Sequence, residues 1–172
     1  MKFKVKVLLM LLAIFVIGFV LPENIVIPVK GATSNDWNKV SYWYEPWGSS
    51  GVHKGIDIFA SKGTELVSTT GGIVLFQGTL IKGGNVILVL GPRWKFHYYA
   101  HLESINVRGF SFVSSSQRIG TVGDSGNAKG KPAHLHYSVI RAIPLPWKVT
   151  TESQGWKKMF FINPGQYIRS GG

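Results

Sequence analysis

Short apolar runs separated by glycines are the feature that most constrains the fold of this chain. The sequence has 21 glycines in 172 residues, and branched or aromatic residues fill the runs between them. Such runs, bounded by turn-forming residues, are typical of β-strands. Since no part of residues 37–172 shows a helical period of useful length, we predict a mainly β domain, a compact sandwich of antiparallel sheets. The predicted strands are residues 71–78, 83–91, 95–102, 118–123 and 133–140.

The first 21 residues differ in kind from the rest of the chain. Three lysines among the first six residues precede an uninterrupted apolar run from Val7 to Leu21. A basic start followed by an apolar run is typical of an export signal. The run is shorter than the span of about 20 residues that usually crosses a membrane, yet no convincing cleavage site follows it. Residues 1–21 are therefore predicted to be a signal peptide or an N-terminal membrane anchor. Both place the protein outside the cytoplasm, in the periplasm, the cell envelope or the medium.

The composition of the chain restricts the kinds of partner and of metal site that the protein can have. Residues 22–36 contain two prolines and a polar end, so they predict a linker before a single domain at 37–172. The chain has no cysteine, which excludes a disulfide partner and a thiolate metal site. The formal charge of +11 favours an anionic partner such as a cell-wall polymer or lipid headgroups. The export signal argues against nucleic acid.

Two histidines flank Leu135 in the strand predicted at 133–140. Side chains two residues apart on a strand point to the same face, and the Cα atoms of His134 and His136 would lie about 6.6 Å apart. This arrangement suits a shared metal site, or one metal ligand beside one catalytic base. An isolated pair of this kind is more often two ordinary, half-exposed histidines.

A second candidate lies at residues 51–59. His53 and Asp57 are four residues apart, too far to share an ion on an extended strand. Gly55, between them, permits a bend that brings the imidazole and the carboxylate together. Nitrogen and oxygen ligands without a thiolate are typical of hydrolytic zinc sites, which keep one position open for water. The alternative is a turn histidine beside a solvated aspartate.

Two further stretches could complete such a site. Strand alternation predicts that His97 and His101 share one face, with Tyr99 between them. Only one of these histidines is expected to reach a site formed elsewhere, because about 13 Å separates them along a strand. The glycine-rich residues 123–136 predict a loop that shapes a groove beside His134 and His136.

The order of these motifs is more specific than any one of them. H-x-x-x-D at residues 53–57 is followed by Y-x-H-L at 99–102, then by G-x-S-G at 123–126 and H-L-H at 134–136. This order, on a β-rich exported domain, resembles the lysostaphin-type (LytM-type) zinc metallopeptidases, which cut the peptide part of bacterial peptidoglycan. The resemblance covers residues 37–168.

The resemblance implies a fold, an activity and a site. The fold is the antiparallel β-sandwich of that family, a duplicated hybrid motif. The activity is that of a zinc-dependent endopeptidase that hydrolyses peptide crosslinks or stem peptides of peptidoglycan through metal-activated water. His53, Asp57 and His136 would bind Zn²⁺, and His101 and His134 would be the catalytic histidines. Which of these two is the base stays open. The alternative is a non-catalytic peptidoglycan-binding or hydrolase-activating module on the same fold.

The remaining site hypotheses concern the surroundings of this centre. Ser138 occupies a position where family members often have glutamate, which bears on groove shape and substrate preference. The aromatic segment 33–51 could be core, a substrate platform or a lid. Its polar residues Asn35, Asp36 and Asn38 are candidates to reach the metal in a latent form. The candidates for substrate binding are Tyr99, Tyr137 and Asn127.

Overall fold

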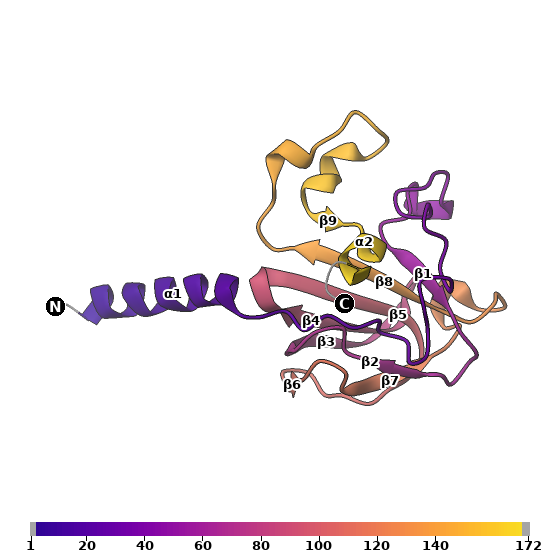
Figure 1. Ribbon diagram of the computed structural model, residues 1–172, viewed down its shortest axis with the longest axis horizontal. Helices are drawn as coiled ribbons and strands as arrows, with labels where there is room; N and C mark the ends of the chain where they lie inside the picture. Colours follow the sequence, from indigo (N-terminus) through magenta and orange to yellow (C-terminus); the bar gives the residue numbers. More distant parts are fainter. Residues whose placement is uncertain (1–2, 170–172) are drawn as a thin grey trace.

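The computed structural model describes residues 3–169 and divides into one long helix and one β domain. Figure 1 shows helix α1 (Phe3–Val20) projecting away from the domain. No residue of α1 is buried, and the helix is long and apolar enough to cross a membrane. The only other α-helix in the described part is α2 (Pro164–Arg169). Single turns of 3-10 helix occur at Gly48–Ser50, Pro92–Trp94, Gly126–Ala128 and Pro146–Lys148, with a longer one at Gly155–Met159.

The predicted mainly β class is confirmed. All strand pairs are antiparallel, and they connect into one sheet in the order β1-β8-β5-β4-β3-β6, with β7 joining β2 to β5 and β9 joining β8. The strands are β1 (Ile56–Phe59), β2 (Glu65–Val67), β3 (Gly72–Leu80), β4 (Gly84–Gly91), β5 (Lys95–Ile105), β6 (Phe112–Val113), β7 (Arg118–Val122), β8 (His134–Arg141) and β9 (Phe161–Ile162).

The five strands predicted from glycine-bounded runs correspond to β3, β4, β5, β7 and β8. The four strands without a prediction have two to four residues each, too few for an alternating pattern to stand out. The expectation of no helix was wrong for α2, whose six residues are likewise too short to show a period. Tyr167 and Ile168 of α2 pack into the core, so the C-terminal segment packs back on the domain.

Strand β5 is the spine of the sheet, and it changes partners at His101. Residues up to Ala100 pair with β8, whereas Leu102 and the residues after it pair with β7. His101, between them, has a positive φ of 67°, and its N–H donates to the carbonyl of Gly83 at 2.8 Å. A left-handed residue of this kind breaks the strict alternation of side chains along a strand. The two halves of β5 therefore present different faces.

One face of β8 carries the core and the other carries the histidines. Leu135, Tyr137 and Val139 are fully buried, as is Tyr99 on β5. They pack with aliphatic residues of the neighbouring strands into one cluster. Because side chains alternate along a strand, His134, His136 and Ser138 lie on the opposite face. The sheet thus supplies a rigid floor on which polar side chains can be held apart from the core.

Residues 22–36, which the sequence indicates as a linker, lie against the domain. Val26 donates its N–H to the carbonyl of Thr69, and Lys30 donates to Glu65. Val29 forms a bridge with Leu66 and is 1% exposed. Burial of apolar side chains in the stretch IVIPV explains why it packs despite its prolines. The segment that packs on the β domain therefore begins well before residue 37.

Candidate metal centre and cleft

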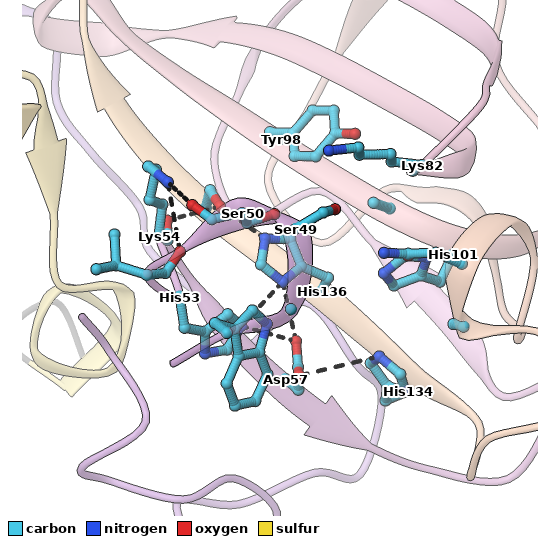
Figure 2. A pocket seen from close by; sticks show the side chains of 18 of the residues that line it. Ser49, Ser50, His53, Lys54, Asp57, Lys82, Tyr98, His101, His134 and His136 are labelled. Atoms are coloured by element: carbon cyan, nitrogen blue, oxygen red, sulfur yellow. Dashed lines mark hydrogen bonds and ion pairs between the residues drawn. The ribbon is translucent and has the colours of Figure 1, made fainter. Parts of the chain in front are cut away.

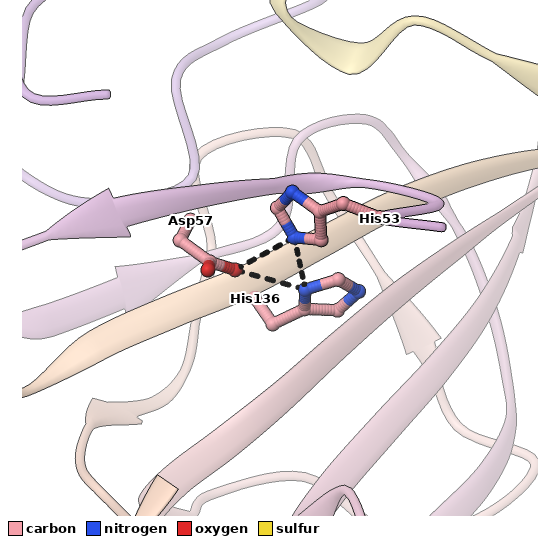
Figure 3. Close-up of side chains that lie close together, drawn as sticks. All are labelled: His53, Asp57 and His136. Carbon is pink, nitrogen blue, oxygen red and sulfur yellow. Dashed lines mark hydrogen bonds and ion pairs between the residues drawn. The ribbon is translucent and has the colours of Figure 1, made fainter. Parts of the chain in front are cut away.

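His53, Asp57 and His136 meet at the junction of β1 and β8. Asp57 is on β1 and pairs in register with His136 on β8, while His53 lies in the turn before β1. The His53 Nε2 atom is 3.1 Å from Asp57 Oδ1 and 3.1 Å from His136 Nδ1, which is 2.9 Å from Asp57 Oδ1 (Figure 3). The three residues that the sequence nominated as metal ligands are thus brought together.

Glycine at position 55 is required for this approach. A Cβ atom on Gly55 would lie 2.5 Å from the Tyr137 carbonyl oxygen, 2.7 Å from Ser138 Oγ and 2.8 Å from His136 Cε1. Real Cβ atoms do not come this close to backbone, so any side chain here would push β8 away. Glycine at this position therefore serves the bend predicted there and also allows close contact with β8, the strand that carries His136.

The ring of His53 is oriented by the atoms behind it. Its Nδ1 lies 3.1 Å from the carbonyl oxygen of Ser41, which can only accept, so Nδ1 carries the proton and donates. In the neutral imidazole Nε2 then has a lone pair. The ring also stacks on Trp47, with 4.0 Å between ring centroids. The Nε2 lone pair is thereby aimed at Asp57 and His136.

The ring of His136 is oriented in the same way by a serine. Its Nε2 lies 3.0 Å from Ser138 Oγ, and this hydroxyl donates its own proton to the carbonyl of Lys54 at 2.9 Å. Ser138 must therefore accept from His136 Nε2–H, which leaves a lone pair on Nδ1. Outer hydrogen bonds that fix the tautomer and orientation of a histidine in this way are typical of metal ligands.

Two imidazole lone pairs and one carboxylate oxygen consequently converge on one point. Burial acts to raise the pKa of Asp57, but where His136 or His53 carries a proton facing the carboxylate, its hydrogen bond and charge outweigh burial and hold this pKa well below its usual range. Such a cluster is stable only with a cation, either a proton or a metal ion, at its centre. The donor separations of 2.9–3.1 Å approach the about 3.4 Å between ligands at 2.0–2.1 Å in tetrahedral zinc. The residues fit zinc.

His101 and His134 lie beside this centre with their ring centroids 5.1 Å apart. Each donates Nδ1–H to a carbonyl, His101 to Ser125 at 2.9 Å and His134 to Pro132 at 2.7 Å. Both therefore keep Nε2 as an acceptor in the neutral form. His134 Nε2 is 4.0 Å from Asp57 Oδ2 (Figure 2). Burial lowers the pKa of His101 to about 4, assisted by His136 and His134, so His101 is a neutral base near pH 7.

The prediction that His97 shares a face with His101 was wrong. His97 is fully buried on the core side, where its Nδ1 lies 2.7 Å from the hydroxyl of Tyr137. Burial lowers its pKa to about 3, with a further contribution from Lys95. The left-handed backbone at His101 turns that side chain to the other face of the sheet. His97 is a core histidine.

The two tyrosines nominated for substrate binding also lie in the core. Tyr99 and Tyr137 are 0% exposed, and the Tyr99 hydroxyl accepts from the backbone N–H of Thr69 at 3.0 Å. Neither lines the cleft over the histidines. Tyr98, on the other face of β5, and Asn127 do line it. The alternation of β5 and β8 explains this result, because the residues next to the site histidines point away from them.

A cleft of about 910 Å³ opens over the metal centre and the two histidines. Trp47, Ser49 and Ser50 of segment 33–51 form part of its wall, whereas Trp37 and Trp43 of the same segment are buried. Asn35, Asp36 and Asn38 do not line the cleft, and Asp36 and Asn38 form hydrogen bonds within their own segment. The segment thus supplies both core and cleft wall.

The cleft also has a basic side that sequence reasoning missed. Lys54, Lys82 and Lys131 line it. Burial lowers the pKa of Lys54, and the charges of Lys157 and Lys82 lower it further. No signal in the sequence groups these lysines, since they lie on three separate loops.

Comparison with known proteins agrees with this geometry. The model of peptidase family M23 matches residues 51–145, more than half of the chain. The chain belongs to peptidase family M23. It is 35% identical over 115 residues to the L-Ala–D-Glu endopeptidase of Bacillus subtilis, covering 62% of this chain and 35% of that protein. It is 35% identical over 92 residues to the murein hydrolase activator NlpD of Salmonella dublin, covering 53% of this chain and 24% of that protein. Both alignments thus span well under half of the relative's length.

The same fold is found in solved M23 structures. The catalytic domain of lysostaphin from Staphylococcus simulans superposes with a TM-score of 0.61 at 23% identity, covering 79% of this chain and 95% of that one. The predicted resemblance to lysostaphin-type enzymes is therefore confirmed, and with it the fold class.

Proposed function

We propose that this protein is a zinc-dependent endopeptidase that hydrolyses peptide bonds in peptidoglycan. The observation that carries the proposal is the convergence of two pinned imidazole lone pairs and the Asp57 carboxylate on one point. Two further imidazoles, with free Nε2 acceptors, line the same cleft. This set is what metal-assisted amide hydrolysis requires, a Lewis acid beside groups that move protons.

The roles follow from the contacts. His53, Asp57 and His136 would hold zinc, which when bound supplies Lewis acidity and lowers the pKa of water toward about 7. His101 is neutral near pH 7 and can accept a proton at Nε2, so we assign it as the base. His134 Nε2 lies 4.0 Å from Asp57 Oδ2 and is placed to hydrogen-bond the developing oxyanion once protonated, or to pass a proton to the leaving amine. The Ser125 and Pro132 carbonyls hold both rings in position.

The competing function is that of a hydrolase-activating module, and the similarity to NlpD favours it. Such a module needs the cleft only as a binding surface. A complete set of five site residues with oriented rings has no use in that role, whereas hydrolysis uses all of them. The endopeptidase is therefore the better supported function.

The proposed location is the outer face of the cytoplasmic membrane, with α1 as the anchor. Glu23, two residues beyond the end of the apolar run, is part of the domain. It pairs with Lys95 at 2.8 Å, lies 3.5 Å from Arg93 and accepts from the Tyr167 hydroxyl at 3.0 Å. Cleavage after Glu23 would remove that residue from the cluster, and cleavage after Val29 would also remove this buried side chain. A processing site within the domain is thus disfavoured, and an uncleaved α1 would hold the domain at the membrane surface.

Mass spectrometry of fragments released from purified peptidoglycan tests the activity. The full chain in detergent is incubated with the wall in the presence of zinc, with a chelator, and as the His136→Ala variant. We expect new peptide ends that disappear in both controls. Intact wall that nevertheless retains the protein would favour the activator module instead.

A further inference from the structure

The cleft over the metal centre is basic on one side. Three lysines line it, and among its described lining residues Asp57 is the only acidic one. None of the three lysines forms an ion pair with any carboxylate of residues 3–169. Other lysines of the domain do so, for example Lys62 with Glu103 and Asp124. The three lysines of the cleft therefore carry charges that no carboxylate of the described residues neutralises.

Lys54 is held in place beside the metal centre without a neutralising charge. Its Nζ donates to the carbonyls of Ser50 at 3.0 Å and Val52 at 3.3 Å. An ammonium group has three donors, so one remains for a ligand. The carbonyl of Lys54 accepts from Ser138, the residue that orients His136. The side chain of Lys54 is therefore held by the turn before β1, and its backbone is held by the serine that orients His136.

Lys82 approaches the same region from the turn between β3 and β4. Its carbonyl accepts from the N–H of Asn127 at 3.0 Å, which fixes the turn against the loop that carries Ser125. Figure 2 shows the Lys82 side chain beside Tyr98, with its amine directed toward the side of the cleft where Lys54 lies. Two ammonium groups that face one cleft without a counter-charge repel each other, and a bound carboxylate relieves that repulsion.

We propose that Lys54 and Lys82 form a carboxylate-binding subsite next to the metal centre, so that the substrate is an acidic stem peptide and not a neutral glycine bridge. This inference rests on the proposed function and names its substrate class. A peptide residue with a free carboxylate beside the scissile bond would satisfy the remaining donor of Lys54 and the ammonium of Lys82. A glycine bridge offers no group that uses either charge.

Two synthetic stem peptides that differ in one group test the subsite. One has a free α-carboxylate on its D-glutamyl residue, and the other has a carboxamide there. With the full chain loaded with zinc in detergent, we expect kcat/KM for the carboxylate peptide to be higher by on the order of tenfold, the effect of one charge-assisted hydrogen bond. The difference should lie mainly in KM and shrink at high salt.

Lysine variants locate the effect. In Lys82→Met we expect the ratio of kcat/KM for the carboxylate peptide to that for the carboxamide peptide to fall to about one, because the group that distinguishes the two peptides has been removed. Lys54→Met should act in the same direction. Lys148→Met is the matched control, because Lys148 is exposed and lies outside the cleft. It removes one charge and should leave the preference intact.

Several results would overturn the subsite. They are equal KM values for the two peptides, or a preference that Lys82→Met and Lys148→Met alter to the same extent. Cleavage of both peptides with equal efficiency would leave the endopeptidase function standing. If neither peptide is cleaved, digestion of whole peptidoglycan decides the endopeptidase function separately, and calorimetric titration with the two intact peptides decides the subsite. Tighter binding of the carboxylate peptide that Lys82→Met abolishes would support it.

Discussion

Two histidines on strand β5, four residues apart, have opposite fates. His97 lies in the core, fully buried and hydrogen-bonded to Tyr137. His101 lies in the cleft, with Nδ1 bound to a carbonyl and Nε2 available as an acceptor. Burial lowers the pKa of both, so both are neutral near pH 7. What separates the core histidine from the cleft histidine here is the direction of the second ring nitrogen and not the pKa.

The same contrast holds between the two faces of β8. Tyr137 and the aliphatic residues beside it form the core, whereas His136 and Ser138 form a chain of hydrogen bonds that ends at the metal centre. The packed core face fixes the backbone from which His136 and Ser138 project. The geometry of the site therefore depends on core residues that do not contact it. Each prediction below changes a residue on one of these two faces.

The largest expected effect is on the cleft side of β5. Replacing His101 with Gln removes the proposed base and should lower kcat by roughly 10²- to 10⁴-fold, with zinc content unchanged. The matched variant His97→Gln should leave kcat within about twofold, because that ring does not reach the cleft. Rates are measured on a stem peptide by chromatography of the products. Similar losses in both variants would contradict the division of β5 into two faces.

His97, on the core side of β5, should make the free energy of unfolding depend on pH. The pKa of His97 is about 3 when folded, against about 6.5 when unfolded. Between these values the unfolded chain binds more protons, so stability is complete above pH 6.5 and falls as the pH drops. From pH 6.5 to 4 this loss is roughly 3 kcal/mol for His97 alone. His97→Gln should flatten the urea-unfolding profile by that amount, and an unchanged slope would refute the buried neutral histidine.

The third prediction concerns the orientation of His136. Ser138→Ala removes the acceptor for Nε2–H, which allows the proton to move to Nδ1, where it competes with the metal. We expect zinc affinity to fall by about 10- to 100-fold, measured by competition with a chromogenic chelator. Ser138→Thr keeps the hydroxyl and is the control. If the alanine variant binds zinc as tightly as the threonine variant, Ser138 does not position the ligand.

The smallest expected effect is at Tyr99. Tyr99→Phe leaves the N–H of Thr69 without its acceptor in the core, which should cost about 1–2 kcal/mol of unfolding free energy. KM for a stem peptide should not change, since Tyr99 does not line the cleft. A raised KM at unchanged stability would restore the sequence-based assignment of Tyr99 to substrate binding.

Much of the metal centre could be predicted from sequence because its elements are local. The spacing of His53 and Asp57 around a glycine, and the alternation of His134 and His136, each place side chains through the geometry of one segment. The ordered motifs then linked the segments. No local pattern contains the register that sets Asp57 opposite His136. The resemblance based on the motif order implied only that the two residues bind one metal.

The failures were of a different kind. The face of His101 depends on a left-handed residue whose N–H binds Gly83 from another hairpin, and the alternation rule does not apply through such a bulge. The burial of Tyr99 and Tyr137 is set by the sheet that covers them. The packing of Val29 and the grouping of Lys54 with Lys82 arise from contacts between distant segments. Long-range contacts therefore account for what the sequence did not predict.

The most direct test of the account is ¹⁵N NMR of the histidine side chains of the full chain during titration with zinc. We predict that one equivalent binds, and that the signals which shift to metal-bound values are Nε2 of His53 and Nδ1 of His136, with the other nitrogen of each ring protonated. His101 and His134 should keep protonated Nδ1 atoms. Zinc bound through His136 Nε2, or through His101 or His134, would contradict the convergence of lone pairs on which the proposed function rests.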